Sequence, residues 1–252
     1  MPAQATIEAQ LNNFMKEIHI ITPVKDSIDT TIKTVESIKS SQLNWPHSYT
    51  IYNDYSTPEN TARLEELAHD KGFTLVNMSD ITSTTSHNYR IVLQEAQKKA
   101  LAADAGVLII ESDVIVAHDT IQRLADASLE LPDCGILAAV TVDDDGNINY
   151  PYLHAQGKEG QIIETHKHCS FCCSLLMPSL LKALDFNQLN PKKHWYDVYI
   201  SHMSLKLKLK NYLFTNIPVV HHPHSSRPHK LLKYKNPLKY YWLKYTQGLD
   251  KI

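Results

Sequence analysis

The sequence predicts an α/β fold in which a mostly parallel central sheet is flanked by helices. Short apolar runs alternate with amphipathic segments between residues 18 and 110, which is the pattern of successive β–α–β units. Acidic residues follow two of these apolar runs, at the points where strands are expected to end. The 252 residues, 43 % of them apolar, are enough for one large domain with a substantial core.

The first expected strand is the apolar run 18–24, which contains Pro23. A helix should follow within 26–42, because four apolar residues there recur at helical spacing. These residues are Ile28, Ile32, Val35 and Ile38. A second strand is expected at 49–56.

Thr57 and Pro58 predict the start of the next helix, because Thr is a good N-cap and Pro suits the first helical position. Gly72 marks its expected end. A third strand is predicted at 73–78, a helix at 88–105 and a fourth strand at 106–113. Ligands of such sheets bind at the carboxyl ends of the strands, so we expect a site there.

Glu111 and Asp113 are the most informative pair at this edge. On a strand, residues two apart point to the same side, so the two carboxylates are expected to converge. Like charges repel unless a positive group lies between them, and a bound cation would supply one. The alternative is a strand that simply ends in solvent.

Beyond residue 120 the alternation is less regular. Residues 135–152 predict a strand, an acidic turn at 143–146 and a second strand, with the turn exposed to solvent. The stretch "SLKLKLK" (204–210) alternates like a strand, although the residues before it favour a helix.

Composition excludes several classes of protein. The net charge of −2 shows no overall nucleic-acid signature. The four cysteines do not resemble a disulfide framework, and neither a signal peptide nor a membrane-spanning apolar stretch is expected. We therefore expect a cytoplasmic protein, with the inner face of the membrane as a candidate peripheral location.

Five segments carry a resemblance that covers residues 17 to about 227. They read "IHIITPVKDS", "IYNDYSTPEN", "IIESDVIV", "HWYDVYISHMSL" and "IPVVHHPHSSR". In order and spacing they resemble the family 2 glycosyltransferases, which have a GT-A fold. The resemblance implies a Rossmann-like nucleotide-binding half, a mixed acceptor-side half, and a single domain over 1–226.

The resemblance implies an inverting, metal-dependent transfer of a sugar from a nucleotide-sugar donor, UDP-linked sugars being favoured. The acceptor would be a glycan or a lipid-linked molecule. The processive synthases' Gln-x-x-Arg-Trp motif is missing, which indicates non-processive transfer. Asn53, Tyr55 and Tyr196 depart from the family pattern, and these departures leave open a non-catalytic nucleotide- or glycan-binding module.

The resemblance also assigns roles to residues. Asp113 is expected to bind Mn²⁺ or Mg²⁺ directly, with Glu111 reaching the metal through water or contacting the ribose. Among the three histidines of the last segment, His222 is favoured as a metal ligand over His221 and His224. Asp197 is expected to be the catalytic base. The expected donor contacts are Pro23, Val24, Lys25, Asn53, Asp54, Glu111, Ser112 and Arg227.

Two further stretches leave alternatives open. "HKHCSFCC" (166–173) contains zinc-type ligands, but it lacks a second cysteine pair, which favours a core or acceptor-side strand. The tail 227–252 holds seven basic residues against one acid, with interleaved aromatics. This composition is typical of an interfacial amphipathic helix, and an anionic membrane surface is a candidate partner; a helix packed on the domain is the alternative.

Overall fold

The computed structural model of the chain describes residues 15–131, 133–193, 195–222 and 236–246. The strands are β1 (Ile18–Val24), β2 (His47–Asn53), β3 (Thr74–Asn77), β4 (Gly106–Ile110), β5 (Val114–Ile115), β6 (Cys134–Val142), β7 (Ile162–Glu164), β8 (Cys173–Leu176) and β9 (Lys210–His221). The α-helices are α2 (Ile28–Lys39), α3 (Pro58–Lys71), α4 (Tyr89–Ala103), α5 (Thr120–Glu130), α6 (Pro178–Ala183), α7 (Tyr196–Lys206) and α9 (Pro237–Thr246).

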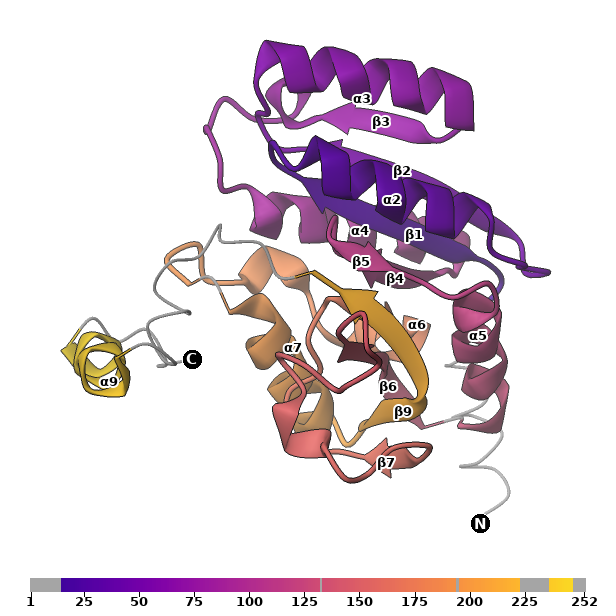
Figure 1. The fold of residues 1–252 in the computed structure, drawn as a ribbon, viewed down its shortest axis with the longest axis vertical. Coiled ribbons are helices and arrows are strands. Elements are labelled where there is room, and N and C mark those ends of the chain that lie inside the picture. The colour runs from indigo at the N-terminus through magenta and orange to yellow at the C-terminus, as the bar shows by residue number, and fades with distance from the viewer. Residues whose placement is uncertain (1–14, 132, 194, 223–235, 247–252) are drawn as a thin grey trace.

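All nine described strands belong to one sheet. Its order is β3-β2-β1-β4-β8-β6-β9-β5, and β7 pairs with β9 outside this path. The first four strands are parallel, β8 runs antiparallel to both of its neighbours, and β9 is parallel to β6. The predicted α/β class is confirmed, with a parallel half followed by a mixed half (Figure 1).

Helices cover both faces of this sheet. Helices α2, α3 and α5 pack into one core, and α4, α6 and α7 pack into another (Figure 1). Successive strand residues alternate between the two cores, as the pleat requires: Ile20 belongs to the first core and Ile21 to the second. Because both faces are buried, β1, β4 and β6 are almost continuously apolar.

Local signals place the early helices as expected. Thr57 caps α3 by accepting a 3.3 Å hydrogen bond from the backbone N–H of Asn60. Gly72 ends the helix with φ of 66°, a left-handed conformation that glycine adopts without steric cost.

Two expectations for the second half are corrected. The hairpin predicted at 135–152 has one strand, β6, and after the acidic turn only an isolated bridge between Val142 and Ile148. The alternating segment that begins at Ser204 is not a strand, because α7 continues through Lys206 and packs Ile200 into the core. Tertiary packing here overrides a short local pattern.

Gln97 joins α4 to the mixed half of the fold. Its buried amide donates to the carbonyls of Leu181 (2.8 Å) and Leu184 (2.5 Å), and its oxygen accepts from the N–H of Phe186 (2.9 Å). These bonds satisfy backbone groups that α6 and the following turn leave unpaired.

Replacing Gln97 with Met should keep the volume but leave buried backbone groups without partners. We expect a loss of about 2–3 kcal/mol in the free energy of unfolding, measured by urea denaturation. Lys98→Met, at the exposed neighbouring position of α4, serves as the control and should change stability by less than about 0.5 kcal/mol. Equal effects in the two variants would contradict this role.

Candidate active site

The carboxyl ends of β1, β2 and β4 meet at one edge of the sheet, and their loops are bonded to one another. The N–H of Asp54 donates to the carbonyl of Val24 at 2.7 Å. The hydroxyls of Ser27 and Ser112 lie 2.9 Å apart. These hydrogen bonds hold together the loops that follow the three strands.

Asp54 lies at the centre of a hydrogen-bond network on one side of this edge of the sheet. It is 8 % exposed and accepts hydrogen bonds from the Ser86 hydroxyl (2.7 Å), the Asn88 N–H (2.9 Å) and the Asn88 amide (2.7 Å). A carboxylate offers about four lone-pair positions, and side chains and backbone of the described residues occupy three of them. Asp54 therefore fixes the segment that leads into α4, and within the described part of the chain it keeps one acceptor position open.

Asn53 lies beneath this loop. It is 3 % exposed, and its amide donates to Asn77 (2.8 Å) and Thr61 (3.0 Å) while its oxygen accepts from the Ser56 N–H (3.2 Å). These bonds use both donors, so the structure places Asn53 in the scaffold that holds β2, β3 and α3 together.

Lys25 lies at the rim, next to Pro23 and Val24 at the end of β1. Its ammonium donates to the carbonyl of Tyr55 at 2.8 Å and lies 3.6 Å from Asp26. Asp26 and Tyr55 both have positive φ, 53° and 59°, so the two loops turn sharply at this edge.

Glu111, Ser112 and Asp113 form a turn rather than the end of a strand, because β4 stops at Ile110 and the N–H of Val114 bonds to the carbonyl of Glu111 at 3.2 Å. The expected strand alternation of the two carboxylates is therefore wrong. Both nevertheless approach the same group, the imidazole of His221, because β5 begins at Val114 and pairs with His221.

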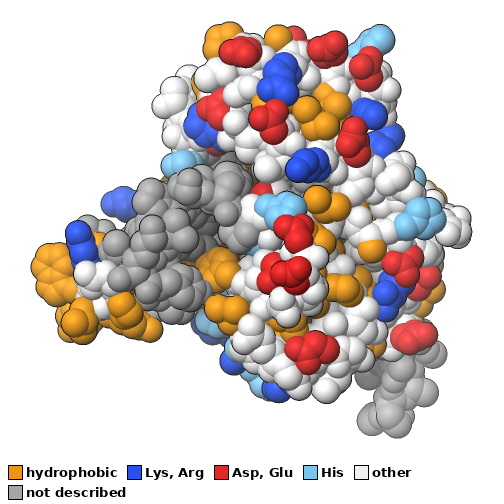
Figure 2. All heavy atoms as spheres, in the orientation of Figure 1, with side chains coloured by type: hydrophobic (Ala, Val, Ile, Leu, Met, Phe, Trp, Pro, Cys, Tyr) orange, Lys and Arg blue, Asp and Glu red, His pale blue; other side chains and the backbone are white. Residues whose placement is uncertain are grey.

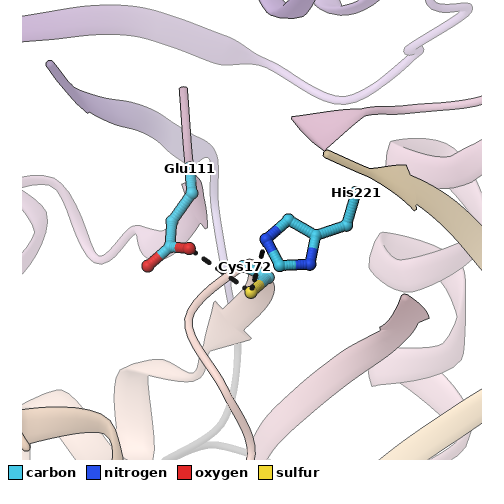
Figure 3. A group of neighbouring side chains, drawn as sticks. All are labelled: Glu111, Cys172 and His221. Carbon is cyan, nitrogen blue, oxygen red and sulfur yellow. Dashed lines mark hydrogen bonds between the residues drawn. The ribbon is translucent and has the colours of Figure 1, made fainter. Parts of the chain in front are cut away.

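Glu111, Cys172 and His221 form the centre of the site, and Figure 3 shows their side chains pointing toward one another from three different segments. The Cys172 thiol donates to Glu111 Oε2 at 3.3 Å and lies 3.9 Å from His221 Nε2. Asp113 Oδ2 lies 3.6 Å from the same His221 nitrogen. Two carboxylates, a thiol and an imidazole thus share one nearly buried volume.

The orientation of His221 is set by its other ring nitrogen. Nδ1 donates to the carbonyl of Tyr150 at 2.9 Å, which turns Nε2 toward the carboxylates. Burial lowers the pKa of His221, but the nearby charges of Asp113 and Glu111 outweigh it, and the net shift is upward. The surroundings therefore favour positive charge at this point.

Cys172 shows the same electrostatics from the other side. Burial raises the pKa of its thiol well above the usual range, and the charges of Glu111 and Asp113 raise it further. The thiol is 3 % exposed. In the absence of a cation the Cys172 thiol keeps its proton and donates a hydrogen bond to Glu111.

His222 does not join this group. Its ring bonds to Asp144 in the exposed acidic turn at 2.8 Å, while its N–H bonds to the carbonyl of Asp113. Neighbouring residues of a strand point to opposite sides, so the position expected for His222 is taken by His221. His224 and Arg227 lie outside the described residues.

Asp197 stands in the first turn of α7, and α7 is bonded to the loop that carries Cys172. The Ser201 hydroxyl accepts from the N–H of Cys169 at 3.0 Å. Burial, with a smaller contribution from the charge of Asp197, raises the pKa of Cys169 to about 12. The charge of Asp197 also adds slightly to the upward shift that burial gives the pKa of Tyr152. Asp197 is therefore close to the segment that leads directly to the site.

The donor set fits a divalent cation. Carboxylate and imidazole are ligands for Mn²⁺, and carboxylates suit Mg²⁺. The hydrogen bond from His221 Nδ1 to a backbone carbonyl is the outer-shell arrangement that metal-binding histidines usually have. Glu111 and His221, with Asp113 adjacent, could hold such an ion.

Sequence patterns alone did not identify several residues of the site. Cys172 was assigned only to a cluster of zinc-type ligands and to a strand. Its place opposite Glu111 comes from the antiparallel pairing of β4 with β8, which brings the N–H of Glu111 to 2.9 Å from the carbonyl of Cys172. Ser27 and Tyr150 carried no local signal. The other cysteines and nearby histidines do not form a metal cluster within the described part of the chain.

The fold, with a parallel half followed by a mixed half, is similar to that of solved glycosyltransferases with a GT-A fold. The chain superposes on S. aureus TarS 1–349 in complex with UDP-GlcNAc with a TM-score of 0.61 at 16 % identity, covering 84 % of this chain and 60 % of TarS. A mannosyltransferase from Pyrobaculum calidifontis in complex with GDP-Man and Mn²⁺ gives 0.60 at 14 %, covering 93 % and 68 %.

GalNAc-T7 with UDP, GalNAc and Mn²⁺ gives a TM-score of 0.59 at 11 % identity, covering 82 % of this chain and 44 % of that one. The chain thus spans about 60 % of the TarS chain it superposes on. No family model matches the sequence, and no curated protein matches it either.

His221 and His222 offer a matched test of the cation site. We expect His221→Ala to weaken Mn²⁺ binding at least about ten-fold, because the His221 Nε2 lies near Glu111 in the proposed cation site. Loss of even an outer-shell partner of a metal ligand lowers metal affinity about 10–100-fold. His222→Ala should leave the affinity nearly unchanged. Isothermal titration calorimetry measures both, and the reverse ranking of the variants would return the role to His222.

Proposed function

We propose that the protein is an inverting, metal-dependent glycosyltransferase that uses a nucleotide-sugar donor. The observation that carries this proposal is the convergence of Glu111, Asp113 and His221 at the ligand-binding edge of a GT-A sheet. The solved neighbours that are bound to UDP-GlcNAc and to GDP-Man with Mn²⁺ support a nucleotide-sugar donor.

Glycosyl transfer leaves a diphosphate whose negative charge must be stabilised. A divalent cation held beside Glu111, Asp113 and His221 would neutralise that charge. The protein's own part is to hold the two carboxylates close together, with their orientation fixed by Cys172 and by the pairing of β5 with β9. The Ser27–Ser112 contact keeps the same turn against the loop after β1.

Asp197 is proposed to take the proton of the acceptor hydroxyl as that hydroxyl attacks the anomeric carbon. Direct attack on the face opposite the leaving diphosphate inverts the configuration. Support comes from its position at the start of α7 and from its electrostatic effect on Cys169 and Tyr152, which lie next to the site.

The nucleotide is proposed to lie over the loops that follow β1 and β2. The remaining acceptor position of Asp54 suits the imino N–H of a pyrimidine, and the backbone of Pro23, Val24 and Lys25 would line the same pocket. We favour a UDP-linked sugar for this reason. Asn53 is assigned a positioning role beneath the loop, and Arg227 is retained as a candidate diphosphate contact.

The acceptor is proposed to be a glycan or lipid-linked molecule, modified without processive elongation. A second candidate function is a binding module without catalysis, because Asn53 and Tyr55 replace family residues. Turnover by the native chain separates the two.

We further propose that the tail 227–252 binds the anionic, cytoplasmic face of a membrane. In α9, four large apolar side chains recur at helical spacing and are exposed. They are Leu238 (85 %), Tyr241 (53 %), Trp242 (64 %) and Tyr245 (87 %). Figure 2 shows this helix as a largely apolar surface, whereas basic and acidic side chains are interspersed over α2 and α3. Among the described residues, no helix is long and apolar enough to cross a bilayer.

The central test is calorimetry of UDP binding with and without Mn²⁺. We expect Mn²⁺ to strengthen UDP binding to the native chain. In Asp113→Asn this Mn²⁺-dependent increase in UDP affinity should be at least about ten-fold smaller, because the variant removes a carboxylate charge from the site. Asp144→Asn, an exposed acid outside the donor cluster, is the control. Equal, metal-independent affinities in all three proteins would refute the proposed donor site.

Asp197→Asn should bind UDP with Mn²⁺ normally and lose about 10²–10⁴-fold in transfer rate, the usual contribution of a general base. A radiolabelled-sugar transfer assay measures the rate. Asp185→Asn, which removes an exposed carboxylate elsewhere, should retain activity. Full turnover by the Asp197 variant would place the base elsewhere.

Leu238→Glu combined with Trp242→Glu should weaken co-sedimentation with anionic liposomes at least about ten-fold, because burial of each apolar side chain contributes about 1.5–3 kcal/mol. Leu129→Glu is the control, since Leu129 is 66 % exposed on α5. Native binding should also decline with salt. A native chain that ignores anionic liposomes at low salt would favour the packed-helix alternative.

A further inference from the structure

Cys172 distinguishes this site from a purely oxygen-and-imidazole cation site. Its sulfur lies between a carboxylate oxygen and an imidazole nitrogen, and the three donor atoms of Glu111, Cys172 and His221 all lie within 4.8 Å of one another. The cluster is enclosed, since Cys172 is 3 % and His221 5 % exposed. A sulfur in this position must influence which ion the site accepts.

The spacing of the donors matches one small ion. Metal–ligand bonds of about 2.0–2.3 Å in a tetrahedral arrangement separate neighbouring donor atoms by about 3.3–3.6 Å. The observed separations are 3.3 Å from Cys172 Sγ to Glu111 Oε2 and 3.9 Å from Sγ to His221 Nε2. These two separations lie within a few tenths of an ångström of that range, and the third, between the donor atoms of Glu111 and His221, is within 4.8 Å.

The supporting backbone holds each donor in place. Glu111 and Cys172 are joined through their main chains at 2.9 Å, and His221 is held by the carbonyl of Tyr150. Asp113 Oδ2 lies 3.6 Å from His221 Nε2 but is not part of the three-donor group. Three protein ligands with a remaining open position are the usual composition of a catalytic zinc site.

Ligand softness then decides the ion. Thiolate selects Zn²⁺ and related thiophilic ions, whereas Mg²⁺ and Mn²⁺ favour oxygen donors. A ring of carboxylates alone would favour the hard ions.

We propose that Glu111, Cys172 and His221 form a three-ligand site that binds Zn²⁺ or Co²⁺ through the Cys172 sulfur, in preference to Mg²⁺ and in competition with Mn²⁺. On binding, the Cys172 S–H bond breaks, its proton passes to solvent, and the sulfur electron pair bonds to the ion; a protonated His221 likewise releases its Nε2 proton to solvent, which frees the Nε2 lone pair for the ion. The open position takes water, or a diphosphate oxygen; only this last ligand rests on the proposed function.

The test uses Co²⁺ as the probe, because a cobalt–thiolate bond gives a charge-transfer absorption in the near ultraviolet that histidine and carboxylate ligands do not give. The full chain is titrated with Co²⁺ in the absence of nucleotide, and bound Co²⁺ is then displaced with Zn²⁺. Cys172→Ser removes the sulfur but keeps a hydroxyl donor for Glu111. Cys173→Ser, the adjacent buried thiol outside the donor cluster, is the matched control.

We expect the absorption band in the native chain and in Cys173→Ser, its loss in Cys172→Ser, and Zn²⁺ affinity at least about ten-fold weaker in Cys172→Ser. Mn²⁺ affinity of Cys172→Ser should be nearly retained, because Glu111 and His221 remain. Thermal melting without metal confirms that each variant is folded.

A native chain without the band, or a Cys172→Ser variant that keeps it, would overturn the proposal. These outcomes are separate from the fate of the enzyme assignment, because no sugar or nucleotide is present. A chain that transfers sugar with Mn²⁺ but shows no cobalt–thiolate band would retain the proposed function and lose only the sulfur ligand.

Discussion

Negative charge gathered in a nearly buried volume is the constraint on which the rest of the site depends. Like charges such as those of Glu111 and Asp113 repel one another in a poorly hydrated site, and a positive partner relieves that repulsion. His221 lies within 3.6 Å of Asp113 and has an upward-shifted pKa, so its protonated ring can supply part of that charge. The negative electrostatic potential that favours a proton on His221 Nε2 would equally favour a metal cation bound at that nitrogen.

Strand pairing is what makes this crowding tolerable. β4 is fixed on both sides by β1 and β8, and β5 is fixed by β9, so the turn between β4 and β5 has little freedom to open and relieve repulsion. Strand pairing and apolar burial next to the site therefore hold the carboxylates in place, since Ile110, Val114 and Cys172 belong to the first core. Preorganised charge of this kind needs no rearrangement when a ligand arrives.

The parallel half of the fold could be predicted from sequence because its signals are local. The cap at Thr57, the stop at Gly72 and the apolar runs each depend on neighbours within one turn or strand. The position of Asp113 just after β4 could also be predicted, since it follows a recognisable strand. That His221 rather than His222 lies beside Glu111 and Asp113 could not be predicted, because it depends on the register of β9 against β5 and β6. Cys172 depends on β8 inserting between β4 and β6, which no local pattern encodes. The prediction of a hairpin after β6 was wrong for a related reason, because alternating apolar and polar residues indicate a strand only where a partner strand is present.

The distances along the chain between the donors have a consequence for folding. Glu111 and Cys172 are 61 residues apart, and Cys172 and His221 are 49 apart, so the cluster consists entirely of non-local contacts, which form slowly. It is incomplete until β9, the last strand described, has paired. Partly folded chains therefore lack the complete cluster, and an ion held by it would stabilise only the fully assembled sheet. Ligand binding at this cluster would therefore require that the whole sheet has folded.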